Sequence, residues 1–126
     1  MGNMNDMKLA VVLFAHGSRD ARWREPVEAV AQRMRTRQPG VTVACAYLEL
    51  VEPDLPTAAA RLIADGARAL RVVPLFLGMG KHVREDLPQL IEALRAAHPE
   101  VLFSLAPAVG ETTEVIDLLA DIALRD

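Results

Sequence analysis

The chain has 126 residues, the length of one domain, so we expect residues 1–126 to form a single domain with residues 1–7 as a flexible N-terminus. Hydrophobic residues make up 52% and charged residues 25% of the chain, a balance typical of globular proteins and not of disordered ones. A net charge of −3 argues against the broad basic field that holds nucleic acids, and no apolar run reaches the ~18 residues of a membrane span.

Four apolar runs have the length of β-strands. All are rich in valine, leucine and alanine, without a polar residue at every second position, which is typical of strands covered on both faces. The expected strands are Leu9–Ala15, Val41–Leu48, Ala69–Leu77 and Val101–Ala106.

Four segments with apolar residues at helical spacing follow these strands. Pro26 is tolerated near the first turn of the first helix, Asp54 is expected to cap the second, and Gly66 suits its exit. The second helix is expected over 55–65, and the apolar stripes of the others comprise Trp23, Val27, Val30, Ala31 and Met34; Leu87, Leu90, Ile91 and Leu94; and Val115, Leu118, Leu119 and Ile122.

The alternation of strands and helices predicts an α/β fold of three layers. Right-handed crossovers give a four-stranded, mainly parallel sheet with helices on both faces, as in flavodoxin-like domains. If the strand order is 2-1-3-4, strands one and three are neighbours and flank the point where the chain reverses its direction across the sheet. Ligands of open parallel sheets bind at that point, outside the carboxyl ends of the strands.

Cys45 is the single cysteine and lies inside an apolar run, so we interpret it as a small core residue. A lone cysteine cannot build a disulfide framework and fits a reducing compartment. With no signal-peptide pattern at the start of the chain, we expect a cytoplasmic protein.

The loops after strands one and three carry two of the three histidines. His16 opens the segment His-Gly-Ser-Arg-Asp, and His82 lies within Gly78–Asp86, beside two glycines and a lysine. With strands one and three as neighbours, these imidazoles are expected to face each other across the crevice. His98, before a proline at a helix end, is interpreted as a surface residue.

Two phosphate chemistries fit the sequence poorly. A P-loop needs a glycine where Leu75 stands and a serine or threonine where His82 stands, so no ATP or other nucleotide is expected. In histidine phosphatases an arginine precedes the histidine and clamps the phosphoryl group, whereas Ala15 occupies that place here.

Each loop histidine has two interpretations: it is a structural residue, or it is a metal ligand. Neutral imidazole is the commonest ligand for first-row metals such as iron, cobalt and nickel. Glu49, and also Glu52, would offer a carboxylate at the end of the second strand.

The same loops make the chain similar to the small sirohydrochlorin cobaltochelatases, the class II chelatases of the CbiX and SirB type. The resembling segments are Leu13–Asp20, Leu48-Glu49 and Val73–Pro88, and the similarity runs from about Lys8 to Asp126. The third segment is the most specific, because its strand, glycines, histidine and Asp-Leu-Pro all agree.

The resemblance implies a lyase that inserts a divalent metal into sirohydrochlorin, without ATP, in cobalamin biosynthesis. His16, His82 and Glu49 would be the metal ligands and catalytic groups. Residues that would bind the carboxylate-rich rim of the substrate are Gly17, Ser18, Arg19, Arg22, Gly80, Lys81 and Arg84.

The resemblance also implies a homodimer, because one small domain offers only one wall to a broad macrocycle. Co²⁺ is the expected metal substrate. Fe²⁺ or Ni²⁺ insertion, for sirohaem or a nickel tetrapyrrole, and a non-catalytic metal or tetrapyrrole carrier remain as alternatives.

Overall fold

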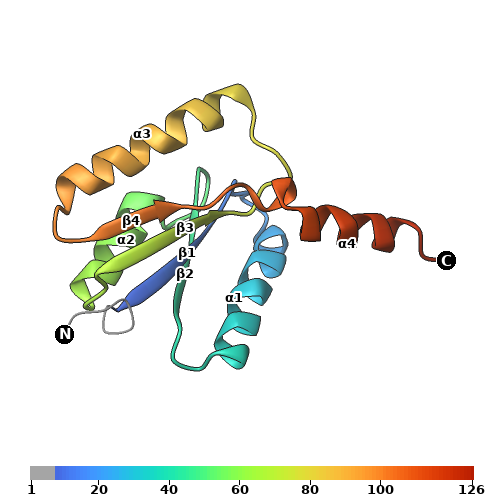
Figure 1. The fold of residues 1–126 in the computed structure, drawn as a ribbon, viewed down its shortest axis with the longest axis horizontal. Coiled ribbons are helices and arrows are strands. Elements are labelled where there is room, and N and C mark those ends of the chain that lie inside the picture. The colour runs from blue at the N-terminus through green and yellow to red at the C-terminus, as the bar shows by residue number, and fades with distance from the viewer. Residues whose placement is uncertain (1–7) are drawn as a thin grey trace.

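The computed structural model describes residues 8–126, so the flexible segment expected at residues 1–7 lies outside the described residues. Strands and helices alternate along the chain (Figure 1). The strands are β1 (Leu9–Ala15), β2 (Thr42–Tyr47), β3 (Ala69–Pro74) and β4 (Leu102–Leu105). The helices are α1 (Glu25–Arg37), α2 (Leu55–Ala64), α3 (Lys81–Ala97) and α4 (Thr113–Ala123), with the 3₁₀-helices η2 (Ala21–Arg24) and η3 (Val109–Glu111) before α1 and α4. Within residues 8–126, no helix is long and apolar enough to cross a membrane.

The four strands form one parallel sheet in the order β2-β1-β3-β4, which confirms the predicted order. Phe14 in β1 lies opposite Ala46 in β2 on one side and Pro74 in β3 on the other. The chain therefore leaves β1 and β3 toward opposite edges of the sheet, and the carboxyl ends of these two strands flank the topological switch point.

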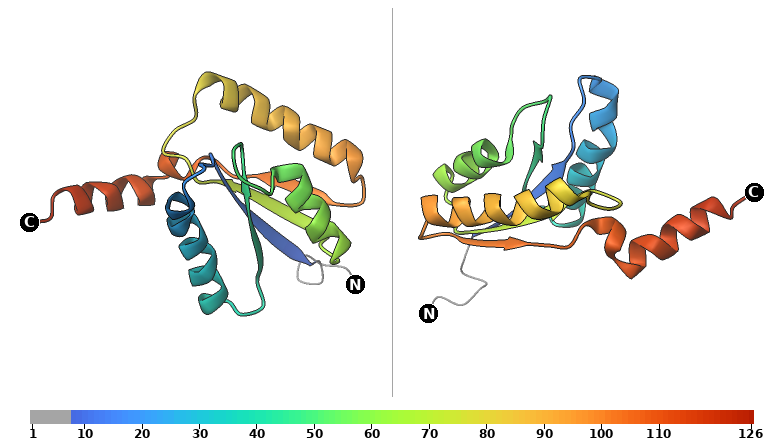
Figure 2. Two further views of the ribbon diagram at one scale, coloured as in Figure 1. Left: turned by 180° about the vertical axis from the view of Figure 1, so that it is seen from behind. Right: turned by 90° about the horizontal axis from the view of Figure 1, so that it is seen from above.

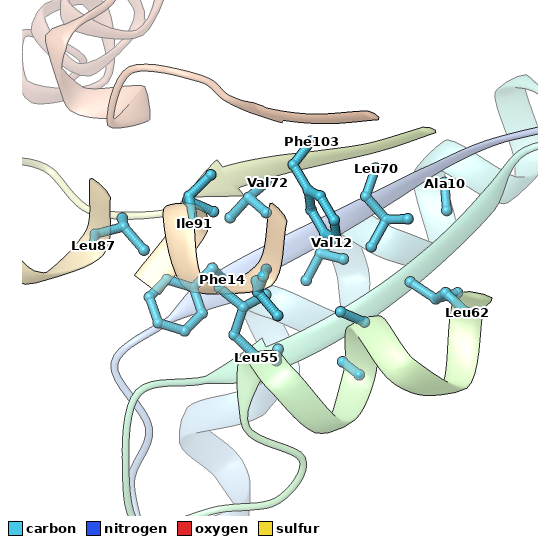
Figure 3. Close-up of a cluster of buried hydrophobic side chains, with 14 of the residues drawn as sticks. Ala10, Val12, Phe14, Leu55, Leu62, Leu70, Val72, Leu87, Ile91 and Phe103 are labelled. Atoms are coloured by element: carbon cyan, nitrogen blue, oxygen red, sulfur yellow. The ribbon is translucent and has the colours of Figure 1, made fainter. Parts of the chain in front are cut away.

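The larger part of the core lies between the sheet and helices α2 and α3. Alternate side chains of a strand point to the same face, and Phe14, Leu70 and Leu55 meet there almost fully buried. Figure 3 shows strand side chains such as Val12 and Val72 between the residues of these two helices. This packing fixes the position of α3, which carries His82, relative to β1 and β3.

Helix α1 covers part of the opposite face. Its Ala31 packs in a cluster with Val11, Leu13 and Val43, and the predicted three layers are thereby confirmed. The same face over β3 and β4 is open, because Leu102 there is 62% exposed.

The local signals for α2 act as the sequence predicts. The Asp54 carboxylate accepts a hydrogen bond of 2.9 Å from the Thr57 backbone N–H. Hydrogen bonding from the side chain and the backbone of Thr57 holds the pKa of the Asp54 carboxyl below its ordinary value. After α2, Gly66 takes a φ of +107°, which side-chain-bearing residues rarely adopt.

Two boundaries near the candidate site differ from the prediction. The third strand ends at Pro74 instead of Leu77, and α3 begins at Lys81, so His82 lies in the first turn of a helix and not in a loop. The polar residues between Lys81 and Asp86 conceal this helix start, because the apolar stripe that predicts the helix begins only at Leu87.

Helix α4 departs from the prediction most. The sequence predicts helices on the two faces of the sheet, yet none of the residues of α4 is buried, and the helix points away from the body of the molecule (Figures 1 and 2). The turn before it is locked in place: the Gly110 N–H donates to the Phe76 carbonyl at 2.9 Å, and a Cβ on Gly110 would lie 1.9 Å from the Leu77 carbonyl oxygen. The direction of α4 thus follows from the backbone of the β3–α3 loop.

Cys45 is half-buried in β2 rather than fully enclosed. It packs beside the α1 clusters with Met34 and Trp23. Burial, together with the nearby Glu28 carboxylate, raises the pKa of the Cys45 thiol, because both disfavour the thiolate.

Candidate metal and tetrapyrrole site at the carboxyl edge of the sheet

The loop after β1 presents His16 at the switch point. Its imidazole is exposed, and the ring lies against Phe76 with 4.4 Å between the ring centroids and an angle of 39° between the planes. Phe76 itself is buried, so it forms a fixed support for the imidazole. No sequence pattern indicates this pair, because the two residues are distant along the chain.

The loops after β1 and β2 are tied together directly behind His16. The Glu49 N–H donates to the His16 carbonyl at 3.0 Å, and the Leu48 N–H donates to the Ala15 carbonyl at 2.9 Å. Gly17 has a φ of +105°, and a Cβ there would lie 1.8 Å from the Glu49 carbonyl oxygen. Only glycine fits this contact, which brings the backbones of His16 and Glu49 together.

His82 lines a cavity of about 410 Å³ at the same edge of the sheet. Phe14, two residues before His16, and Leu48, which precedes Glu49, line this cavity together with His82. The remaining lining residues come from α3 and are Val83, Asp86, Leu87 and Leu90. The predicted proximity of the β1, β2 and α3 segments is thus present, while Asp86 and Leu48 line the cavity without having been predicted as site residues.

Glu49 is exposed and lines a neighbouring cavity of about 390 Å³ with Glu52 and Arg61. Its backbone is therefore joined to His16, but it does not line the cavity of His82. Within residues 8–126, no three histidine, cysteine, aspartate or glutamate side chains are gathered closely enough to hold a metal ion. The structure brings together the segments that carry His16, His82 and Glu49, but not a closed cage of three ligands.

Four basic side chains surround this edge. Arg19 and Arg22 follow β1, Lys81 and Arg84 lie in the first turn of α3, and all four are exposed. In the described part of the chain, none of them forms an ion pair. Their charges therefore remain available to anionic groups from outside the protein.

The remaining predicted residues divide into structural and open positions. The Ser18 hydroxyl accepts the Asp20 N–H at 3.1 Å and so helps to fold the turn before η2. Gly80 is the N-cap of α3, and a Cβ there would meet no atom of residues 8–126 within 4 Å. The protein itself does not require glycine at position 80, whereas a ligand that approaches the backbone closely would.

The fold and the site define a small three-layer α/β domain with two exposed imidazoles and four exposed basic side chains at the carboxyl edge of a parallel sheet. The family model described as CbiX matches residues 10–125, and the chain belongs to this family.

Three relatives illustrate the match. The chain is 35% identical over 82 residues to a sirohydrochlorin cobaltochelatase of Methanococcus aeolicus, covering 65% of this chain and 57% of the relative. It is 28% identical to the sirohydrochlorin ferrochelatase of Bacillus subtilis, covering 87% of this chain and 42% of the relative. The crystal structure of a CbiX protein from Marinobacter aquaeolei VT8 superposes with a TM-score of 0.78 at 37% identity, covering 91% of this chain and 93% of the other. The chain spans less than two thirds of the length of the first two curated relatives it matches.

Proposed function

We propose that this protein is a sirohydrochlorin cobaltochelatase, a lyase that inserts Co²⁺ into sirohydrochlorin without ATP or another nucleotide, in cobalamin biosynthesis. The observation that carries the proposal is the placement of two imidazoles, His16 on the buried Phe76 and His82 on the cavity beside it, around the carboxyl ends of adjacent strands. The activities named for the relatives support the same chemistry.

In the proposed reaction, His16 and His82 bind the incoming metal, and as each imidazole releases the metal to the macrocycle, its freed nitrogen accepts one of the displaced protons. Two pyrrole N–H protons must leave the macrocycle as the metal enters. Imidazole is the side chain that most readily exchanges a proton around neutral pH, which makes it a suitable acceptor. Glu49 assists in metal delivery or proton removal, since its loop is bonded to the backbone of His16.

The rim carboxylates of the substrate are bound by the unpaired basic groups. Arg19 and Arg22 contact one part of the rim, and Lys81 and Arg84 contact another, with the positive N-terminus of α3 adding to the field. The backbone N–H groups of Gly17, Ser18 and Gly80 are further donors. This arrangement orients the flat macrocycle over the edge of the sheet, where the imidazoles lie.

The second wall of the site is proposed to come from a second copy of the chain, in a homodimer. The cavity at His82 is open to one side and small compared with a tetrapyrrole, so one copy covers only part of the substrate. We place the protein in the cytoplasm, which the lone cysteine supports.

The proposal is tested by following the absorbance of sirohydrochlorin under anaerobic conditions, with the protein and Co²⁺, Fe²⁺ or Ni²⁺ in separate reactions. Co²⁺ insertion faster than the spontaneous reaction is expected. Faster Fe²⁺ or Ni²⁺ insertion would instead assign the ferro- or nickel-chelatase, and stoichiometric binding without turnover would assign a carrier.

The two imidazoles are tested by His16→Ala and His82→Ala, each expected to lower kcat about 100-fold, within the usual range for general acid–base groups. His98→Ala is the matched control. His98 follows α3 at the opposite edge of the sheet, with its ring beside Phe103, so this variant is expected to keep full activity. If His16→Ala and His82→Ala were as active as the His98→Ala control, His16 and His82 would be excluded from the active site.

A further inference from the structure

Two of the three phenylalanines of the chain lie at the candidate site. Phe14 and Phe76 are 1% and 3% exposed, and their rings meet edge to face, with 6.0 Å between the centroids and 65° between the planes. Aromatic pairs of this kind are favourable beyond the area that they bury. The ring of Phe76 is therefore held in one orientation, against the exposed imidazole of His16.

The register of the sheet explains why Phe76 lies beside His16. In the paired strands β1 and β3, Phe14 lies opposite Pro74, and the Leu75 N–H donates to the Phe14 carbonyl at 2.8 Å. His16 and Phe76 each follow this pair by two residues, and side chains two residues apart in an extended chain point to the same face of a sheet. The contact between the imidazole and the Phe76 ring, at 4.4 Å between centroids, thus continues the pairing of β1 with β3.

His16 lacks the polar contact that usually orients a metal-binding imidazole. Histidines that bind metals generally donate their other ring N–H to a carboxylate, a carbonyl or a water, which fixes the ring and makes the ligating nitrogen more basic. Within residues 8–126, no protein group forms a hydrogen bond or an ion pair with the imidazole of His16. In this part of the chain, the orientation of the ring therefore rests on its contact with Phe76.

We propose that Phe76 is a positioning residue for His16 in metal transfer, and that Phe14 keeps Phe76 in place. The nitrogen lone pairs of an imidazole lie in the plane of the ring, so a ring whose face rests on Phe76 keeps its edge free for a metal. An aromatic support orients the ring without raising the basicity of its nitrogens, whereas a carboxylate would do both. His16 thus binds the metal in a defined direction and still releases it. This inference rests on the proposed function and assigns to it a residue that acts only through His16.

The test is Phe76→Leu, which removes the flat ring and keeps an apolar side chain. By NMR of the metal-free protein, the ring protons of His16, assigned by their absence in His16→Ala, are expected upfield of those of an unstructured histidine and should return toward that position in Phe76→Leu. The dissociation constant for Co²⁺ alone, followed by visible absorbance, is expected to rise roughly 10-fold, as when the support of a metal-binding histidine is removed. Phe76→Met fills more of the vacated space and should give both results, so the test does not depend on how well Phe76→Leu folds.

Phe103→Leu is the matched control. Phe103 belongs to the same core cluster as Phe76 and is 6% exposed, but its ring lies beside His98 at the opposite edge of the sheet. This control should lower the melting temperature about as much as Phe76→Leu and leave the His16 signals and the Co²⁺ affinity unchanged. Unchanged His16 signals or an unchanged Co²⁺ affinity in Phe76→Leu, or an equal loss of affinity in Phe103→Leu, would overturn the positioning role. Absence of turnover of sirohydrochlorin with every metal would instead reject the proposed function, and the NMR and Co²⁺ measurements would still decide the role of Phe76.

Discussion

Gly17 is the position where a single methyl group should disturb the candidate site most. In Gly17→Ala the new Cβ would lie 1.8 Å from the Glu49 carbonyl oxygen and 3.0 Å from its carbon, and the backbone at φ +105° would be strained in addition. Relief requires the loops after β1 and β2 to separate, which breaks the hydrogen bond from the Glu49 N–H to the His16 carbonyl.

The magnitude follows from these two costs. A strained backbone of this kind costs about 1–3 kcal/mol, and a lost hydrogen bond about 1 kcal/mol, so we expect a loss of about 2–4 kcal/mol in the free energy of unfolding. For a domain of this size the melting temperature should fall by roughly 10 °C. Urea denaturation and thermal melting, both followed by circular dichroism, measure the loss.

Gly40→Ala is the matched control for Gly17→Ala. Gly40 follows α1 at the opposite edge of the sheet, a Cβ there would meet no atom within 4 Å, and its φ is not in the left-handed region. The control should melt within a few degrees of the unaltered protein. An equal, small effect of both substitutions would refute the steric reasoning at Gly17.

Three further predictions concern other positions. Asp54→Ala should lower the free energy of unfolding by about 1 kcal/mol, because the cap of α2 is lost. This contribution should be fully present above the pKa of the carboxyl in the unfolded chain and should disappear as the pH falls through the lowered pKa in the folded chain. The difference between the urea midpoints of the two proteins, followed against pH, measures it. The Cys45 thiol should react with iodoacetamide at pH 8 several-fold more slowly in the folded protein than in urea, because burial raises its pKa; equal rates would show that it is not protected. Gly80→Ala should leave the melting temperature nearly unchanged, because the new Cβ meets open space. It should raise the KM for sirohydrochlorin, because the substrate is proposed to approach that backbone. An unchanged KM would exclude Gly80 from the proposed site.

The sheet could be predicted because burial on both faces leaves a plain sequence pattern. The continuous apolar runs at Leu9–Ala15 and Ala69–Pro74 identify two buried strands, and the loops that follow them locate the candidate site. The start of α3 could not be predicted in the same way. Its first turn faces solvent, so Lys81 and His82 carry no apolar periodicity.

The finer features of the site depend on contacts between distant segments. Gly17 and Gly80 look alike in the sequence. The Glu49 carbonyl leaves no room for a Cβ at Gly17, whereas no atom of the described residues lies within 4 Å of a Cβ at Gly80. The support of His16 by Phe76 likewise appears only when β1 and β3 are paired. For α4 the pattern predicts an apolar stripe correctly but contains no information about which surface covers it.

Phe76 joins two parts of the molecule. Its carbonyl accepts the Gly110 N–H at the base of α4, and its ring supports the imidazole of His16. A force that changes the angle of α4 would therefore reach His16 through one residue, without passing through the sheet. The turn at the base of α4 and the imidazole of His16 thus share one support, so a substitution that shifts the backbone of Phe76 is expected to disturb both.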